Sequence, residues 1–470
     1  MNQRFVIALF FWGTIGGFSF LKAQTFSPVL GLRQAIDSGM HHYGLLRSKR
    51  NIQKSRLAGI ESAKSENYPD FSISAQQDFG SINSAFGPLY SYKGLSVASS
   101  GPTRQNPSWN AAFGALYLAN IQWDFFAFGK SKEKVNLSRK YYALSGLDLD
   151  QEEFQQKIKI SAAYLSLLAA KTLLKSQKAN LDRAISLRDV VLSRTQSGLN
   201  PGVDSSIANA QVSNARFLMV SAEESVQELE TSLGILMGIS PKSYNLDSTY
   251  SQSIPKDLFL DAPRDISLHP TLKYYQGILE VQNQNIRFLK KTALPVFTVF
   301  DVFQSKASGF DYNYGDANPN AFTQNYFKGI SPSVSNYLIG LGVTWNVTGL
   351  VRIHRQVLEQ NYYLESLKNN FEQTYSEILA QQNLSNSRLK NALKQYQEGP
   401  IQVKAAKDAY IQKSVLFKNG LSNIVDVSQT LFALNQAETQ LAVAYNNVWS
   451  ALLLKTASNG DFNQFLNQIP

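Results

Sequence analysis

Two stretches of this 470-residue chain decide its fold, because one repeats the other. The first reads SGLNPGVD from Ser197 to Asp204, and the second reads NGLSNIVD from Asn419 to Asp426. Glycine, leucine, valine and aspartate recur at one constant offset along the chain, that from Gly198 to Gly420. Glycine suits the left-handed backbone position at which a helix ends and the chain reverses. The two stretches therefore predict an internal duplication with one helical hairpin in each copy.

Landmarks on either side of these turns extend the duplication. The offset of the turns also pairs Trp123 with Trp345, and a slightly longer offset pairs Pro69 with Pro295. The difference falls in a loop, where insertions are tolerated. The sequence thus predicts a first repeat over 24–245, a linker over 246–267, a second repeat over 268–458 and a C-terminal tail over 459–470.

Each copy has the same predicted order of elements. Phe71, Ile73 and Ala75 alternate with polar residues, which is typical of a half-exposed strand. Loops rich in Gly, Ser and Asn then lead to a returning strand, which in the second copy has Tyr337 and Ile339 on its apolar face. The predicted elements are a helix (29–67 or 268–292), a strand from Pro69 or Pro295, a loop (80–111 or 305–334), the returning strand, a long helix (129–196 or 350–417), the turn and a shorter helix (203–239 or 423–457).

The long helices carry apolar residues seven apart. Val357, Leu364, Phe371 and Ile378 form one such stripe, which is typical of helices packed in a supercoil. At 1.5 Å per residue each long helix spans about 100 Å, roughly twice the length of a shorter one. We therefore expect the shorter helices to stack end to end, 203–239 on 268–292 and 423–457 on 29–67, with 240–267 outside as a collar.

The N-terminus resembles a secretory signal peptide. Arg4 precedes an uncharged apolar run from Phe5 to Leu21, and Ala23 is a small residue at a suitable cleavage site. The sequence predicts a signal peptide over 1–23. The rival interpretation is an anchor helix, because about 17 apolar residues are the lower limit for spanning a bilayer.

Composition excludes most chemistry. The chain has no cysteine and four histidines, so it has no thiol nucleophile and no Cys-ligated metal. His41 and His42 are neighbours on a helix and point in different directions. The formal charge of +10 is spread in mixed sign along the chain, which is not the clustered pattern of a nucleic-acid-binding face. We expect no catalysis, no cofactor, no metal and no nucleic-acid partner.

The four predicted strands cannot close a barrel alone. Membrane barrels begin at about eight strands, and an open sheet edge in lipid leaves backbone groups unpaired. Strands of this chain in a membrane must therefore join those of other copies. Aromatic residues near the strand ends suit the girdle of such a barrel: Phe125, Phe126, Phe128, Phe303 and Tyr337.

This order of elements, given twice, resembles the TolC family of outer-membrane efflux and secretion channels. The matching residues are the strand-opening prolines, the tryptophans of the returning strands, the two Gly-Leu turns and the Ile424–Val427 start of the last helix. The resemblance implies a mainly α, α+β fold. It also implies a homotrimer with a shared twelve-stranded outer-membrane barrel and a periplasmic tunnel of coiled-coil helices. The implied partners are a periplasmic adaptor, an inner-membrane transporter and outer-membrane lipid.

The resemblance also points to an entrance gate. Acidic residues just after the second turn ring the periplasmic entrance in that family, and Asp426 matches the first of these positions. Gln429 occupies the second position, so the ring carries half the usual charge. The alternative is local: Asn423 caps the last helix, and an acid in the first turn interacts well with the helix dipole.

Two further features are candidate sites. The tips Gly198-Leu199 and Gly420-Leu421 resemble the surfaces that dock onto the adaptor, although the glycines also serve the turns. Gly399-Pro400 lies inside the last long helix, where proline removes a hydrogen bond, so we expect a hinge or a static kink there.

Two other classes of protein compete with an outer-membrane channel. A periplasmic coiled-coil adaptor or structural protein would have one helical hairpin between compact β domains, whereas this chain has two hairpins with their own strand pairs. A soluble exported enzyme or carbohydrate-binding protein would need a convergent polar site, and the sequence contains no such motif.

Overall fold

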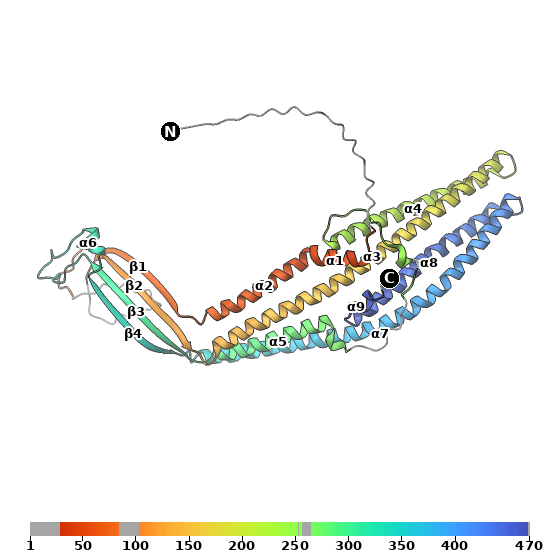
Figure 1. Cartoon of the computed structure of the whole chain (residues 1–470). Coiled ribbons are helices and arrows are strands. Elements are labelled where there is room, and N and C mark those ends of the chain that lie inside the picture. Colours follow the sequence, from red (N-terminus) through yellow and green to blue (C-terminus); the bar gives the residue numbers. More distant parts are fainter. Residues whose placement is uncertain (1–28, 84–102, 252, 256–264, 469–470) are drawn as a thin grey trace, which may run out of the picture.

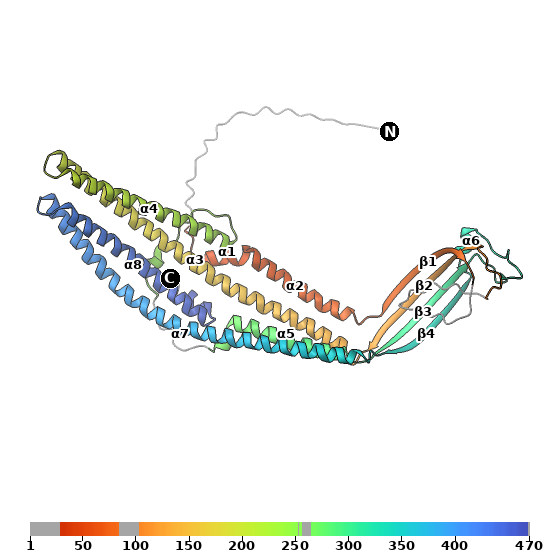
Figure 2. The same ribbon diagram turned by 180° about the vertical axis from the view of Figure 1, so that it is seen from behind.

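The computed structural model describes residues 29–83, 103–251, 253–255 and 265–468, so the predicted signal peptide lies outside the described residues. The molecule is elongated, with a β-sheet at one end and two hairpin tips at the other (Figures 1 and 2). The described helices are α1 (Leu32–His42), α2 (Gly44–Ser65), α3 (Lys130–Gln196), α4 (Gly202–Met237), α5 (Pro270–Lys291), α6 (Tyr326–Ile330), α7 (Gly349–Lys418), α8 (Ile424–Ser458) and α9 (Phe462–Leu466). The strands are β1 (Asp70–Ser81), β2 (Ala111–Phe126), β3 (Val296–Ser308) and β4 (Val334–Thr344).

The four strands form one antiparallel sheet in the order β1-β2-β3-β4. Phe71 pairs with Ile121, and Phe303 pairs with both Ala119 and Tyr337, which places these residues on one face. That face is largely apolar and exposed, and the other face carries most of the polar residues of the strands. The predicted alternation is confirmed, and the outer edges of β1 and β4 have no strand partner among the described residues.

The two copies share one contact in atomic detail. The indole N–H of Trp123 donates to the carbonyl of Asn67, and that of Trp345 donates to the carbonyl of Ala293. The tryptophans keep the offset of the two turns, and their acceptors keep the longer offset of the two strand prolines. Both copies therefore fasten the returning strand to the end of the preceding helix in the same way.

The long helices α3 and α7, of 67 and 70 residues, run the whole length of the helical part. The predicted stripe of α7 turns Leu364 and Ile378 inward, and Ile378 packs in a cluster with Leu272 of α5. Further along, Leu389 and Tyr396 belong to the core shared with α8, and Tyr396 contacts Tyr445. The buried apolar residues of α7 therefore move to another face of the helix where α8 replaces α5 as its neighbour.

The expected end-to-end stacking of the shorter helices is wrong in its pairing. Gly238, at the end of α4, lies against His42 and Tyr43, where α2 begins. Gly460, at the end of α8, lies against His269, where α5 begins. Each shorter helix therefore continues the helix that precedes the strands of its own copy, not that of the other copy. Each stacked pair thereby flanks the long helix to which its own turn connects it.

The collar and the chain end form the main core at mid-length. The Tyr164 hydroxyl of α3 accepts a hydrogen bond from the N–H of Asp247, and the indole of Trp449 in α8 donates to the carbonyl of Ser253. The segment after residue 458, expected as a tail, contains α9, whose Phe465 is fully buried in the same core. The described part of the collar thus lies against the helices rather than between them.

Three local features differ from the sequence expectations. The first helix is divided at Tyr43, whose extended backbone separates α1 from α2. The strands continue beyond the expected loop starts, to Ser81 and Ser308. The second loop contains the short helix α6, which packs on β2 through Gly329 and Phe113. Among the described residues, no helix has the length and apolar character needed to cross a membrane.

Candidate functional site

The two hairpin tips lie side by side at the end of the molecule opposite the sheet (Figures 1 and 2). Gly198 and Gly420 have positive φ angles of 71° and 75°. The N–H of Leu199 donates to the carbonyl of Arg194 over 2.9 Å, and the N–H of Leu421 donates to that of Leu416 over the same distance. These bonds close a Schellman-type helix end in both copies, which explains the glycines structurally.

The leucine side chains of the tips have no such structural role. Leu199 is 67% exposed and Leu421 is 74% exposed. Val203 and Val425, one turn further along, are also exposed. Apolar side chains that cluster at a protruding end often mark a contact surface.

Asp426 is held by local partners. Asn423 caps α8 by accepting a hydrogen bond from the backbone N–H of Asp426 over 2.9 Å. The carboxylate accepts bonds from Lys413 Nζ at 2.8 Å and from Ser422 Oγ at 3.1 Å. These bonds, that from Lys413 first, lower the pKa of the Asp426 carboxyl. The structure therefore contains the predicted Asn423 cap, with Asp426 in the first turn of α8. The Asp426 side chain is nevertheless 37% exposed, and Gln429 is also exposed.

Arg194 joins the two tips and is not among the residues predicted from the sequence. This residue lies in the last turn of α3, where its Nε donates to Asn200 Oδ1 over 2.8 Å. Its Nη1 donates to the carbonyl of Lys418, at the end of α7, over 3.1 Å. Its guanidinium also lies 5.5 Å from the ring centroid of Phe417, which is buried. A basic residue at a helix end is common, so the sequence alone does not indicate that Arg194 contacts the α7–α8 hairpin.

A second contact between the hairpins lies further from the tips. Arg183 of α3 forms a two-pronged ion pair with Glu438 of α8, at 2.7 Å and 3.3 Å. Ser176 donates to the same carboxylate over 3.1 Å. The fork geometry of an arginine–carboxylate pair fixes both orientation and distance. The two hairpins are therefore fastened at two levels.

The hinge candidate lies inside an unbroken helix. α7 continues through Gly399 and Pro400 to Lys418. Gly399 is buried, and a Cβ atom there would lie 2.7 Å from Cδ1 of Leu441 in α8. Glycine therefore lets α7 approach α8 closely at this level. The hinge role stays a prediction.

His269 lies where the end of α8 meets the start of α5, and its ring forms two hydrogen bonds. The Nδ1 atom of His269 accepts from the N–H of Thr271 at 3.2 Å, so its Nε2 carries the proton and donates to the carbonyl of Ala457 at 3.1 Å. Burial lowers the pKa of His269. The neutral imidazole thus links the end of α8 to the start of α5, and both of its ring nitrogens are engaged. Within the described ranges, no group of acidic and histidine side chains is suited to a metal ion.

Comparisons with known proteins agree on the architecture. No family model matches the chain, and no curated protein matches it. Solved structures do match over nearly the whole length. One of them is the crystal structure of CusC, a protein that forms a transmembrane channel. It has a TM-score of 0.72 at 12% identity, and the match covers 93% of this chain and 94% of that chain.

Two further structures extend the likeness. The outer-membrane protein VceC from Vibrio cholerae has a TM-score of 0.69 at 16% identity, covering 92% of this chain and 96% of that chain. The CmeC outer-membrane channel of Campylobacter jejuni has a TM-score of 0.71 at 13% identity, covering 91% and 85%. The chain has the TolC fold. The TolC resemblance expected from the turns and strand starts is thus confirmed at the level of the fold, since identities this low show no more.

Proposed function

We propose that this chain is the outer-membrane channel-tunnel of a tripartite efflux or type I secretion system. It conducts substrates passively across the periplasm and the outer membrane, and it performs no catalysis. The observation that carries the proposal is a sheet with one exposed apolar face and, among the described residues, no strand partner at either edge, attached to helices about 100 Å long. A sheet of this kind suits lipid only when its edges are paired.

Three copies of the chain would satisfy both edges. The β4 strand of one copy pairs with β1 of the next, and the three sheets close a twelve-stranded barrel in the outer membrane. The hairpins also leave large apolar side chains uncovered, with Phe217 of α4 71% exposed and Phe432 of α8 62% exposed. A neighbouring copy would cover such side chains in a periplasmic tunnel.

Purification tests this assembly. We expect the protein to fractionate with outer membranes, to need detergent for solubility, and to appear as a trimer by native mass spectrometry. A monomer that stays soluble without detergent would instead support the alternative, a periplasmic coiled-coil adaptor or structural protein.

In the proposed tunnel the hairpin tips form the periplasmic entrance, and Arg194 holds the two hairpins of one copy together. Replacing Arg194 with Ala removes the bond to Lys418 and the contact with Phe417. We expect a higher unitary conductance in planar bilayers, because the α7–α8 hairpin then moves more freely. Arg188→Ala is the matched control, since the side-chain bonds of Arg188 run to its neighbour Asp189 on the same helix. Equal conductances for both variants would exclude the link as a restraint on the entrance.

We assign gating to Asp426 and Gln429, and bending to Gly399 and Pro400. Three Asp426 carboxylates around a trimer axis would attract cations. Asp426→Ala should therefore lower the cation preference measured from the reversal potential, and Pro400→Ala should alter the open probability. An unchanged reversal potential removes the first role, and unchanged gating removes the second.

The exposed tip leucines suit a docking surface for a periplasmic adaptor, which itself couples to an inner-membrane transporter. Leu421→Asp places a charge in this surface without touching the turn hydrogen bonds, which involve the backbone. We expect this variant to keep its conductance in bilayers but to lose export in cells. Lys418→Asp, which changes charge beside the same tip, is the control. Normal export by Leu421→Asp would show that the tip does not dock.

A further inference from the structure

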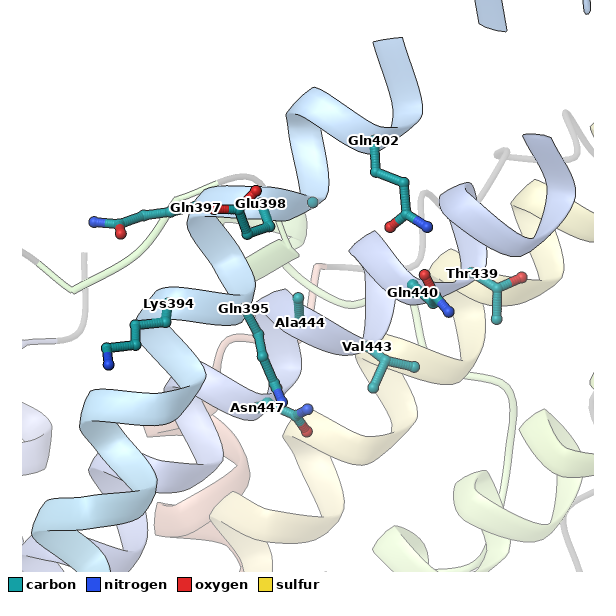
Figure 3. Close-up of a pocket in the computed structure, with 11 residues that line it drawn as sticks. Lys394, Gln395, Gln397, Glu398, Gln402, Thr439, Gln440, Val443, Ala444 and Asn447 are labelled. Carbon is teal, nitrogen blue, oxygen red and sulfur yellow. The ribbon is translucent and has the colours of Figure 1, made fainter. Parts of the chain in front are cut away.

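Two adjoining hollows form a groove along α8. The first, of about 750 Å³, lies between α7 and α8 beside Gly399 (Figure 3). The second, of about 550 Å³, extends over α3 and toward the end of α8. Gln395 and Asn447 line both hollows. We define the two together as the amide groove.

Many lining residues of the amide groove lie on one stripe of α7 and one stripe of α8. Their spacing of three and four residues places them on a single helix face. The α7 stripe contains Arg388, Asn391, Gln395, Glu398 and Gln402. The α8 stripe contains Gln440, Val443, Asn447, Ser450, Leu454 and Ala457.

The collar and the amide groove lie on opposite sides of the helices. In α8, Trp449 reaches the collar through its bond to Ser253, and the groove residue Asn447 lies two positions away. In α3, the Tyr164 hydroxyl accepts a hydrogen bond from the N–H of Asp247 in the collar over 3.2 Å, and the groove residue Ser166 lies two positions away. Two positions rotate a helical side chain by about 200°. Both helices therefore turn one side to the collar and the other to the groove.

We propose that the amide groove faces the lumen of the tunnel and forms a contact strip for uncharged polar groups of the exported solute. This proposal rests on the proposed function, because a lumen exists only in the assembled channel. We expect the collar on the outside of such a tunnel, as the sequence predicts, and this leaves the opposite side of α3 and α8 for the inside.

The chemistry of the lining indicates what it contacts. Carboxamides both donate and accept hydrogen bonds, and Figure 3 shows Gln395, Gln440 and Asn447 on facing sides of the hollow. Most of the lining polar groups carry no charge, and the charged residues are of mixed sign: Arg388, Lys394 and Glu398. Such a lining forms weak hydrogen bonds with amide and hydroxyl groups of a solute and selects little for the charge of the solute.

A helix of a second copy is the competing occupant. Helices that pack on one another bury apolar residues at such spacings. The stripe of the amide groove on α7 is instead entirely polar, and Gln395, Gln402 and Gln440 are exposed. The large uncovered aromatic side chains of the hairpins, Phe217 and Phe432, lie outside the groove lining.

Single cysteines test the orientation, because the chain has no cysteine of its own. Gln440→Cys and Ser450→Cys place a thiol in the amide groove, and Asn245→Cys places one on the collar. We expect a negatively charged thiosulfonate reagent to shift the reversal potential of both groove variants toward cation preference, and a positively charged one to shift it toward anion preference. Asn245→Cys should not respond.

The outcomes separate this inference from the proposed function. If the unmodified protein conducts but neither groove variant responds to the reagents, the amide groove does not face the lumen and the inference is wrong. If the unmodified protein forms no channel at all, the proposed function fails first. Two groove variants are used so that a folding defect in one leaves the other to decide.

A polar probe tests the contact chemistry. Tri-N-acetylchitotriose carries both amide and hydroxyl groups, and we expect it to block the open channel transiently. Gln440→Met keeps the side-chain length but removes one hydrogen-bonding amide per copy, which should shorten the blocked time about fivefold. Asn245→Leu on the collar should leave it unchanged. Equal blocked times for all three proteins, or no block of the unmodified channel, would overturn the assignment of the groove as a contact strip.

Discussion

Replacing Gly238 with Ala is expected to destabilise the protein by about 2–5 kcal/mol. The residue ends α4 with φ at 69°, which costs an L side chain about 1–2 kcal/mol. A Cβ atom would also lie 2.6 Å from the backbone carbon and oxygen of His42 and 2.8 Å from the nitrogen of Tyr43. Because these are backbone atoms, relief requires α4 and α2 to move apart, and such overpacking adds about 1–3 kcal/mol.

Gly198→Ala is the matched control for this prediction. Gly198 has a similar φ of 71°, but a Cβ atom there would meet nothing within 4 Å. It should therefore lose only the conformational part, about 1–2 kcal/mol. Thermal unfolding of the detergent-purified variants measures the difference. Equal losses at both glycines would mean that α4 and α2 move apart at no cost, which contradicts the prediction.

Replacing Lys171 with Met is expected to release the collar from the hairpin. Lys171 of α3 forms an ion pair with Glu230 of α4 at 2.7 Å and also bonds to the carbonyl of Tyr244 in the collar. The same carboxylate accepts from Ser243 Oγ at 3.0 Å and from the N–H of Tyr244 at 3.2 Å. Methionine would leave Glu230, 9% exposed, without its cation.

The expected cost is about 2 kcal/mol. Removing one partner of a fully buried pair costs about 3–5 kcal/mol, and the 26% exposure of the Lys171 side chain reduces this. Hydrogen exchange of the collar amides should therefore become about 30-fold faster. Lys178→Met is the control, because Lys178 pairs with Glu223 on the same two helices but with side chains 54% and 40% exposed. If both variants exchange alike, the ion pair does not hold the collar.

The effect of Lys171→Met also depends on pH in a defined direction. Burial alone would raise the pKa of Glu230, but the bonds from Lys171, Tyr244 and Ser243 lower it overall. A lowered pKa contributes stability above the ordinary value of 4.5, and this contribution is lost as the pH falls through the lowered pKa. The stability difference between wild type and Lys171→Met should therefore shrink as the pH falls below 4.5.

Much of the fold could be predicted from the sequence because its signals are local. Pro69 and Pro295 mark the strand starts within one residue, since proline ends a helix and β1 and β3 begin directly after it. Gly198 and Gly420 mark both turns for a similar reason. Alternation and heptad spacing depend on periodicity, which a single sequence displays.

The pairing of the shorter helices could not be predicted in the same way. End-to-end contacts bury few residues and leave no periodic pattern. The decisive residues are Gly238 and Gly460, which are related by the same offset as the glycines of the two turns. Their partners Tyr43 and His269 are related by the longer offset of the strand prolines. The two helix-to-helix contacts are thus equivalent in the two copies, although the equivalence lies in single residues and not in a periodic pattern.

The candidate site was only partly predictable. The sequence indicated the tips and the capping of α8 at Asn423, because both have local signatures. It did not indicate Arg194 or the Arg183–Glu438 pair, which depend on how two hairpins far apart in sequence lie together. The amide groove has no apolar heptad signature, because its stripe on α7 is polar.

Planar-bilayer recording of the detergent-purified protein tests the central claim most directly. We expect small, stable unitary currents from a trimeric tunnel whose entrance is restrained at the hairpin tips, and larger currents when Arg194 is replaced with Ala. A silent bilayer, with protein that stays soluble without detergent, would contradict it.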